Sequence, residues 1–180
     1  MEAVSRLIEQ GKVRYAVVCN YDAAQLTEAE RYFTLASDQV PYSMVKRNIE
    51  AGLTPYCQEN NRSILAYSPL ERGLLAGKIW LGHAFAPGDH RKEVSFFKEE
   101  NLRRPDALFE LLKPLAAEKH LTLGQLVILW TLQQPGIIIA LVGARNCEQA
   151  IENVKAIDSQ LSNEEVATVL GYLEHLELIA

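Results

Sequence analysis

Four segments of this sequence end an apolar run in residues that can bind a ligand. Their polar ends are Cys19-Asn20, Gln39, Tyr67-Ser68 and Gly143-Ala144-Arg145. Amide side chains donate and accept hydrogen bonds at once, an aromatic ring can stack on a flat ligand, and a guanidinium pairs with anions. Where such groups end neighbouring strands of a parallel sheet, they are expected to gather around one ligand at the sheet's carboxyl edge.

The longest of these segments is ILAYSPLERGLLAGK, residues 64–78. Its apolar run breaks at Tyr67-Ser68-Pro69 and continues into a loop that contains Gly73 and Gly77. A strand whose tip opens into a loop of this kind is the usual place for a ligand site in an α/β protein. Glu71 and Arg72 within the loop are open to a second reading, as an ordinary exposed ion pair.

Alternating patterns of strand and helix predict how these segments are positioned. After a helix at 2–10 we expect four strands, at 13–19, 37–43, 63–68 and 137–142. The predicted intervening and following helices are 25–34, 49–59, 105–119, 122–133, 146–157 and 163–178. This order predicts a parallel sheet with right-handed crossovers. The nearly continuous apolar character of 13–19 favours a strand covered on both faces.

Two architectures fit this order: an open doubly wound sheet, or part of a (β/α)8 barrel. A complete barrel takes ~250 residues, so four strands in a chain of 180 residues make half of one. No G-x-G-x-x-G or P-loop sequence follows any predicted strand, which weakens the Rossmann and nucleotide-triphosphatase alternatives. A polar stretch at 82–106 is longer than most connections, which marks it as functional or mobile. We treat residues 1–180 as one partial domain of the α/β class.

Composition narrows the classes of partner. A net charge of −5 without a basic cluster disfavours nucleic acid, and no apolar run approaches the ~20 residues that cross a membrane. The three cysteines are widely spaced and unpaired by pattern, which favours a reducing compartment, the cytoplasm. The four histidines show no metal-ligand spacing, so we predict no metal.

Several motifs together carry a family resemblance. They are VRYAVVCNY, QVPYSMVKR, LAYSPLERGLLAGK, GDHRKEVSFFKEEN and VGARNCEQAIENV with the trailing LSNEE. In this order and spacing, over essentially all 180 residues, the chain resembles the second half of an aldo-keto reductase, barrel strands five to eight. The resemblance implies a (β/α)8 TIM barrel that binds extended NADPH at its C-terminal face and reversibly reduces aldehydes and ketones.

The resemblance assigns roles to matching positions. It implies that Asn20 and Gln39 hold the nicotinamide carboxamide and that the ring of Tyr67 stacks on the nicotinamide. Asn20 also fits a second role, as a helix N-cap. The positions matching the pyrophosphate loop are Ser68, Leu70, Arg72 and Gly73. Those matching the adenosine end are Gly143, Ala144, Arg145, Gln149 and Asn153, where Arg145 or a neighbouring donor would meet the ribose 2′-phosphate of NADP(H).

The sequence departs from the family pattern in two ways. Val17 stands where the family has glycine, and Cys19, which also fits a small buried hydrophobe, replaces a serine. The larger departure is that the family's catalytic aspartate, tyrosine, lysine and histidine lie on the first four strands, and nothing here matches them. We assign neither Tyr42 nor His90 to these roles, so no catalytic residue is predicted.

Two functions follow as expectations. The chain is the NADP(H)-binding half of a reductase that lacks its proton donor, with the missing N-terminal half or a second copy covering the apolar inner face of the sheet. Alternatively it is a non-catalytic nucleotide-binding or interaction module, like the aldo-keto-reductase-like β subunits of potassium channels, or a decaying remnant. A flavodoxin-like binder is a third possibility, which no phosphate-loop sequence supports.

Overall fold

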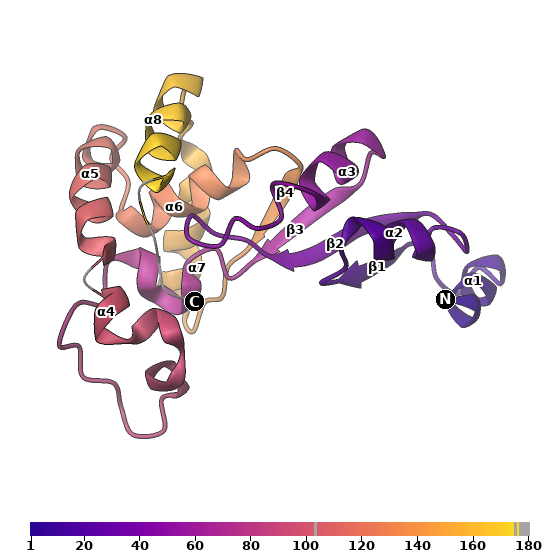
Figure 1. Cartoon of the computed structure of the whole chain (residues 1–180), viewed down its shortest axis with the longest axis horizontal. Helices are drawn as coiled ribbons and strands as arrows, with labels where there is room; N and C mark the ends of the chain where they lie inside the picture. Colours follow the sequence, from indigo (N-terminus) through magenta and orange to yellow (C-terminus); the bar gives the residue numbers. More distant parts are fainter. Residues whose placement is uncertain (103, 175, 177–180) are drawn as a thin grey trace.

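The computed structural model describes residues 1–102, 104–174 and 176, and it contains one parallel sheet in the order β1-β2-β3-β4. The strands are β1 (Ala16–Cys19), β2 (Leu35–Pro41), β3 (Ser63–Tyr67) and β4 (Ile137–Leu141). The α-helices are α1 (Glu2–Glu9), α2 (Ala23–Ala29), α3 (Leu53–Glu59), α4 (Glu99–Leu102), α5 (Arg104–Glu118), α6 (Leu123–Leu132), α7 (Cys147–Val154) and α8 (Asn163–Glu174). Short 3₁₀ helices are η1 (Glu71–Ala76), η2 (His90–Glu93), η3 (Ser95–Phe97) and η4 (Lys155–Asp158). Figure 1 shows α5, α6 and α8 grouped together, with the sheet extending from them toward α1.

One face of the sheet forms the main core. Registered neighbours in a sheet share a face, and Ile64 in β3 pairs with Asp38 in β2 and with Ile137 in β4. Ile64 and its strand neighbour Ala66 are fully buried, and α3 and α6 pack against this part of the sheet. Beyond it, Trp130 of α6 is fully buried and stacks on Tyr42, with ring centroids 6.0 Å apart.

The opposite face of the sheet is open to solvent. Val17 of β1 is 59% exposed and Ile139 of β4 is 43% exposed. Val17 pairs in register with Ser37 of β2, which is buried, whereas Ile139 pairs with Leu65 of β3, which pairs in turn with Gln39 of β2. The prediction that β1 is covered on both faces is therefore wrong for this chain, because only one face packs against its own helices. The expectation that the chain alone exposes its apolar inner face is confirmed.

The predicted elements are all present, with shifted ends. The first strand begins at Ala16 rather than at 13, and the helix predicted at 25–34 already ends at Ala29. The helix predicted at 49–59 begins only at Leu53. Thr122 caps α6 through a capping box with Gln125, as its type and position predict. The end of the last predicted helix, 163–178, lies partly outside the described residues.

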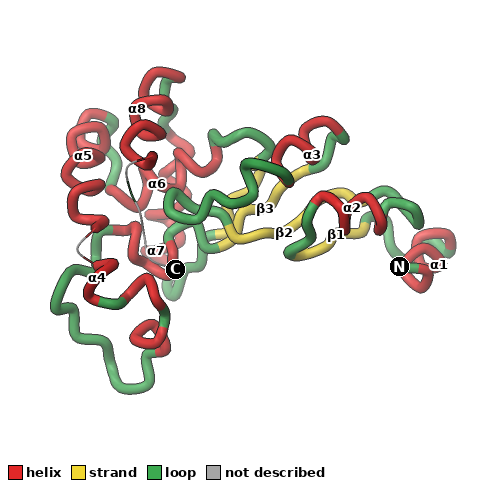
Figure 2. The backbone as a smooth tube through the Cα atoms, in the orientation of Figure 1, coloured by secondary structure: helices red, strands yellow, loops and turns green. Residues whose placement is uncertain are grey.

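The described part of the long polar stretch at 82–106 contains short helices that were not predicted from the sequence. It contains η2, η3 and α4, shown in Figure 2 as short helices joined by loops. Phe97 and Leu102 from this stretch are buried with Leu74 and Ile79, which makes a second, smaller hydrophobic cluster. The aromatic and aliphatic residues spaced among the charges thus anchor this segment against η1.

Asp38 is an ionisable group within the main core. Its side chain is fully buried on the helix-covered face of β2, and neither carboxyl oxygen has a hydrogen-bond partner within the described part of the chain. Burial raises the pKa of Asp38 to about 6, although the backbone amides of Tyr21, Gln39 and Asn20 lie near enough to favour the charged form. The charged carboxylate is therefore poorly stabilised in the folded protein.

We expect Asp38→Asn to stabilise the chain near pH 7.5. The unfolded aspartate titrates near 3.8 and the folded one near 6, so the wild-type protein loses stability as the pH rises between these values. Removing the titration should raise the free energy of unfolding at pH 7.5 by about 1–3 kcal/mol. Urea denaturation followed by circular dichroism would measure this gain, which should shrink toward pH 4. Asp158→Asn, at an exposed position, is the control. An equal gain at both pH values would contradict the assignment.

Candidate functional site

The loop that follows β3 has an unusual backbone. Ser68, Glu71 and Arg72 have φ values of 57°, 42° and 54°, and Gly73 has a φ of 96°. Two hydrogen bonds close the turns, from the Glu71 amide to the Ser68 carbonyl and from the Gly73 amide to the Leu70 carbonyl, each 2.9 Å long. Left-handed conformations of this kind are costly for residues with a Cβ, and they persist only where surrounding contacts hold them.

This backbone sends consecutive side chains in opposite directions. Glu71 is buried, with 6% of its surface exposed, whereas Arg72 is exposed. The reading of Glu71 and Arg72 as an ordinary exposed pair is therefore wrong. At the end of the loop, Gly77 has a φ of 67°, and a Cβ there would come within 2.9 Å of a methyl group of Leu123. Glycine is thus favoured at position 77 by its positive φ, and a larger residue would also require the Leu123 side chain at the start of α6 to move.

The turn that follows β4 is held by side chains of α7. Asn146 caps the helix, its Oδ1 accepting a 2.9 Å hydrogen bond from the Gln149 amide. The Oε1 atom of Gln149 in turn accepts from the Arg145 amide at 2.9 Å, and Asn153 Nδ2 donates to the Gly143 carbonyl at 3.4 Å. These bonds fix the turn from which the Arg145 side chain extends.

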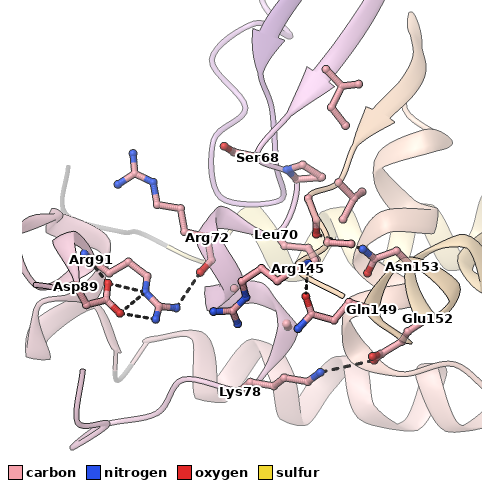
Figure 3. A pocket seen from close by; sticks show the side chains of 18 of the residues that line it. Ser68, Leu70, Arg72, Lys78, Asp89, Arg91, Arg145, Gln149, Glu152 and Asn153 are labelled. Carbon is pink, nitrogen blue, oxygen red and sulfur yellow. Dashed lines mark hydrogen bonds and ion pairs between the residues drawn. The ribbon is translucent and has the colours of Figure 1, made fainter. Parts of the chain in front are cut away.

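The two segments meet at a cavity of about 880 Å³. Figure 3 shows its lining from close by. Nine of the twelve predicted site residues line this cavity. They are Ser68, Leu70, Arg72, Gly73, Gly143, Ala144, Arg145, Gln149 and Asn153. The structure therefore brings together the residues that the resemblance places along the pyrophosphate and at the adenosine end.

The other three predicted residues lie at the strand ends beside the open sheet face, outside the lining of this cavity. Tyr67 donates a 3.0 Å hydrogen bond from its hydroxyl to Asn20 Oδ1, and the Asn20 amide donates to the Gln39 carbonyl at 3.0 Å. Asn20 does not cap α2, because Asp22 fills that position through a capping box with Gln25. Cys19 is exposed, so its reading as a small buried hydrophobe is also wrong.

Sequence reasoning missed several residues of the cavity. Among them are Lys78, Asp89, Arg91 and Glu152. Asp89 and Arg91 lie in the long polar stretch at 82–106. The unusual length of this stretch was the feature of the sequence that could have pointed to them. Arg91 binds the Asp89 carboxylate through Nε and Nη2, and its Nη1 donates to the Arg72 carbonyl at 3.4 Å. Hydrogen bonds from Arg91 hold the pKa of Asp89 well below its usual range.

The balance of charges in the cavity favours an anion. Arg91 is paired with Asp89, and Lys78 lies 3.7 Å from the Glu152 carboxylate (Figure 3). Within the part of the chain that the structure describes, the guanidinium groups of Arg72 and Arg145 form no ion pair. In Figure 3 the Arg145 side chain extends among the lining residues, whereas the Arg72 side chain extends away from Arg145. An unpaired guanidinium at the cavity suits a phosphate group.

Comparison with known proteins agrees with this chemistry. The chain matches the Aldo/keto reductase family over residues 1–174. It is 34% identical to the NADH-specific methylglyoxal reductase of Escherichia coli (strain K12), an alignment that covers 97% of this chain and 53% of that protein. It is 29% identical to the Schizosaccharomyces pombe protein named aldo-keto reductase yakc [NADP(+)], over 99% of this chain and 54% of that one.

Solved structures show the same relationship. The glycerol dehydrogenase AKR11B4 of Gluconobacter oxydans superimposes with a TM-score of 0.87 at 29% identity, covering 99% of this chain and 55% of that one. A thermostable aldo-keto reductase bound to the inhibitor epalrestat gives a TM-score of 0.71 at 26% identity, covering 94% and 52%. The chain therefore spans about half the length of these relatives, and the predicted fold class, half of a (β/α)8 barrel, is confirmed. The match over residues 1–174 shows that this chain belongs to the aldo/keto reductase family.

Proposed function

We propose that this chain is the NADP(H)-binding half of an aldo-keto reductase that reduces aldehydes or ketones. The observation that supports this proposal is the cavity lined by Arg72 and Arg145, neither of which forms an ion pair within the described residues. Tyr67 is the last residue of β3, immediately before the loop that lines this cavity. An extended dinucleotide could therefore place its phosphates against the loop and its nicotinamide toward Tyr67, Asn20 and Gln39. When bound, the cofactor would supply hydride.

The preference for NADP(H) rests on Arg145. Its amide is held by Gln149 and its side chain is exposed at the edge of the cavity, where a ribose 2′-phosphate would gain a charged partner. Of the two relatives, one carries NADP(+) in its name and the other is named NADH-specific. The choice between the two dinucleotides therefore has to be measured on this chain.

Reduction of a carbonyl also requires a proton donor for the developing alkoxide. We propose that a second polypeptide segment, equivalent to the missing half of the barrel, supplies that donor and covers the open sheet face.

We propose further that residues 1–180 form one partial domain, that no nucleic acid is bound, and that the protein works in the cytoplasm. No helix among the described residues has the length and apolar character to cross a membrane.

A second candidate is a nucleotide-binding module without catalysis. The observation that favours it is that residues of this chain already form a cavity of the size and lining described above, whereas Val17 and Ile139 lie exposed on the open sheet face. Such a protein would bind NADPH tightly without any companion. A neighbouring gene that encodes the four catalytic positions would favour the reductase.

We expect the purified chain to bind NADPH more tightly than NADH, and Arg145→Ala to remove the difference. Loss of a charged hydrogen-bonded pair should raise the Kd for NADPH by about 10- to 100-fold, while the Kd for NADH stays nearly unchanged. Quenching of tryptophan fluorescence during titration would measure both constants.

Lys155→Ala provides a matched control, because Lys155 is exposed at the end of α7 and does not line the cavity. This variant should bind both dinucleotides as the wild type does. Equal binding of NADPH and NADH by the wild-type chain would contradict the proposed role of Arg145.

We also expect no turnover from the chain alone. With NADPH and methylglyoxal present, the absorbance at 340 nm should remain constant even at protein concentrations that saturate the cofactor, because we propose that the proton donor lies outside residues 1–180. Sustained oxidation of NADPH by the chain alone would refute the assignment of catalysis to a second segment.

A further inference from the structure

One contact connects two strand ends that the proposed function does not otherwise join. The Oγ atom of Ser43, just past the end of β2, donates a 3.0 Å hydrogen bond to Oε1 of Glu71, in the loop that follows β3. Ser43 is fully buried and Glu71 is 6% exposed. The bond therefore crosses the interior between one strand end and the loop of the cavity.

The donor is held in place by its own turn. The Ser43 amide donates to the Lys46 carbonyl at 3.2 Å, and the Lys46 amide donates back to the Ser43 carbonyl at 3.1 Å. The preceding residue extends the sheet, since the Tyr42 amide donates to the Tyr67 carbonyl at 3.2 Å. The backbone that carries the Ser43 hydroxyl is therefore held by its own turn and, through Tyr42, by the end of β3.

The acceptor lies in the strained part of the loop. Glu71 has a φ of 42° and Arg72, next to it, has a φ of 54°. A residue with a Cβ reaches such a conformation only at a cost of about 1–2 kcal/mol, so tertiary contacts must hold it there. Burial raises the pKa of Glu71, while the hydrogen bond from Ser43 and the charges of Lys46 and Arg72 oppose that rise.

We propose that Glu71 is a positioning residue for the phosphate-binding loop. Its bond to Ser43 holds the carboxylate in the interior and so holds the backbone of Arg72, the following residue, in the lining of the cavity. The same conformation places the Arg72 carbonyl 3.4 Å from Nη1 of Arg91 (Figure 3). This inference rests on the proposed function for the identity of the ligand, but the effect on the loop is independent of any ligand.

The contact should act on one end of the dinucleotide only. The adenosine end is built by the turn after β4, which has its own hydrogen bonds from Gln149 and Asn153. NADPH reaches both ends of the cavity, whereas 2′-AMP carries the adenosine end without the pyrophosphate. Loss of the Ser43–Glu71 bond should therefore weaken NADPH and leave 2′-AMP nearly unaffected.

The test compares Glu71→Ala, Glu71→Gln and Ser43→Ala with the wild-type chain. Glu71→Ala and Ser43→Ala should each raise the Kd for NADPH by about tenfold, the effect of one hydrogen bond to a charged group. Glu71→Gln should restore most of the affinity, because its amide oxygen can accept from Ser43. The double variant should be no weaker than Glu71→Ala, since both changes remove the same bond. In all of these variants the Kd for 2′-AMP should stay within about twofold of the wild-type value, because changes at well-separated sites act independently.

Hydrogen exchange without ligand provides an independent readout. In Glu71→Ala, the amides of Glu71 and Gly73, which close the loop, should exchange faster than in the wild type. The Ala150 amide, bonded to the Asn146 carbonyl in α7, should exchange at the wild-type rate. If the wild-type chain binds no NADPH, the proposed function fails, and this exchange comparison still decides the role of Glu71.

Three outcomes would overturn the inference. The first is wild-type affinity for NADPH together with unchanged loop exchange in Glu71→Ala. The second is an equal loss of affinity for NADPH and 2′-AMP, which would mean that Glu71 serves only the general stability of the chain. The third is failure of Glu71→Gln to recover affinity above that of Glu71→Ala, which would show that the hydrogen bond is not what positions the loop.

Discussion

The parallel hydrogen-bonded ladder centred on β3 is the constraint on which the rest of this structure depends. Ile64 and Ala66 of β3 are fully buried on one face, and the strand pairs with β2 on one side and β4 on the other. Because all four strands run in the same direction, their carboxyl ends meet at one edge. The residues proposed to contact the dinucleotide lie at or near that edge. The edge thus brings together residues as far apart in the sequence as Asn20 and Ala144, which are 124 positions apart.

Two buried acids illustrate how the same desolvation can have different consequences. Asp38 lies within the sheet without a hydrogen-bond partner in the described residues, so its charge opposes folding. Glu71 is also buried, but it accepts a hydrogen bond from Ser43 at the edge where the phosphates are proposed to bind. A carboxylate next to a phosphate site would repel the ligand if it faced the cavity. Its burial beneath the loop removes this negative charge from the lining of the cavity, to which Arg72 belongs.

The open sheet face is consistent with a chain that forms half of a (β/α)8 barrel. A closed barrel buries the inward side chains of all its strands, and here the inward positions of β1 and β4 remain exposed. The cavity that we propose for the phosphates, by contrast, is lined mainly by loops and helices of the described residues. Under the proposed function, affinity for the cofactor's phosphates and closure of the reaction site would therefore depend on different parts of the structure.

The sequence by itself determined the class of fold, the order of its elements and most of the cavity. The periodicity of apolar residues identified all four strands, and the motifs around Ser68 and Arg145 identified the two segments that meet at the cavity. The reason is that strand patterning and loop glycines are local properties, written in neighbouring residues. Helix ends were less well predicted, because tertiary packing decides where the last turns unwind.

Only the tertiary structure decided which side chains face each other across the loops. Nothing local distinguishes Glu71 from an exposed acid, since its burial results from a serine 28 positions earlier. The pairing of Arg91 with Asp89 beside the cavity, and the exposure of Cys19, likewise depend on how distant segments pack. Burial and charge pairing are properties of the assembled chain, and they set which of its cations remain available to a ligand.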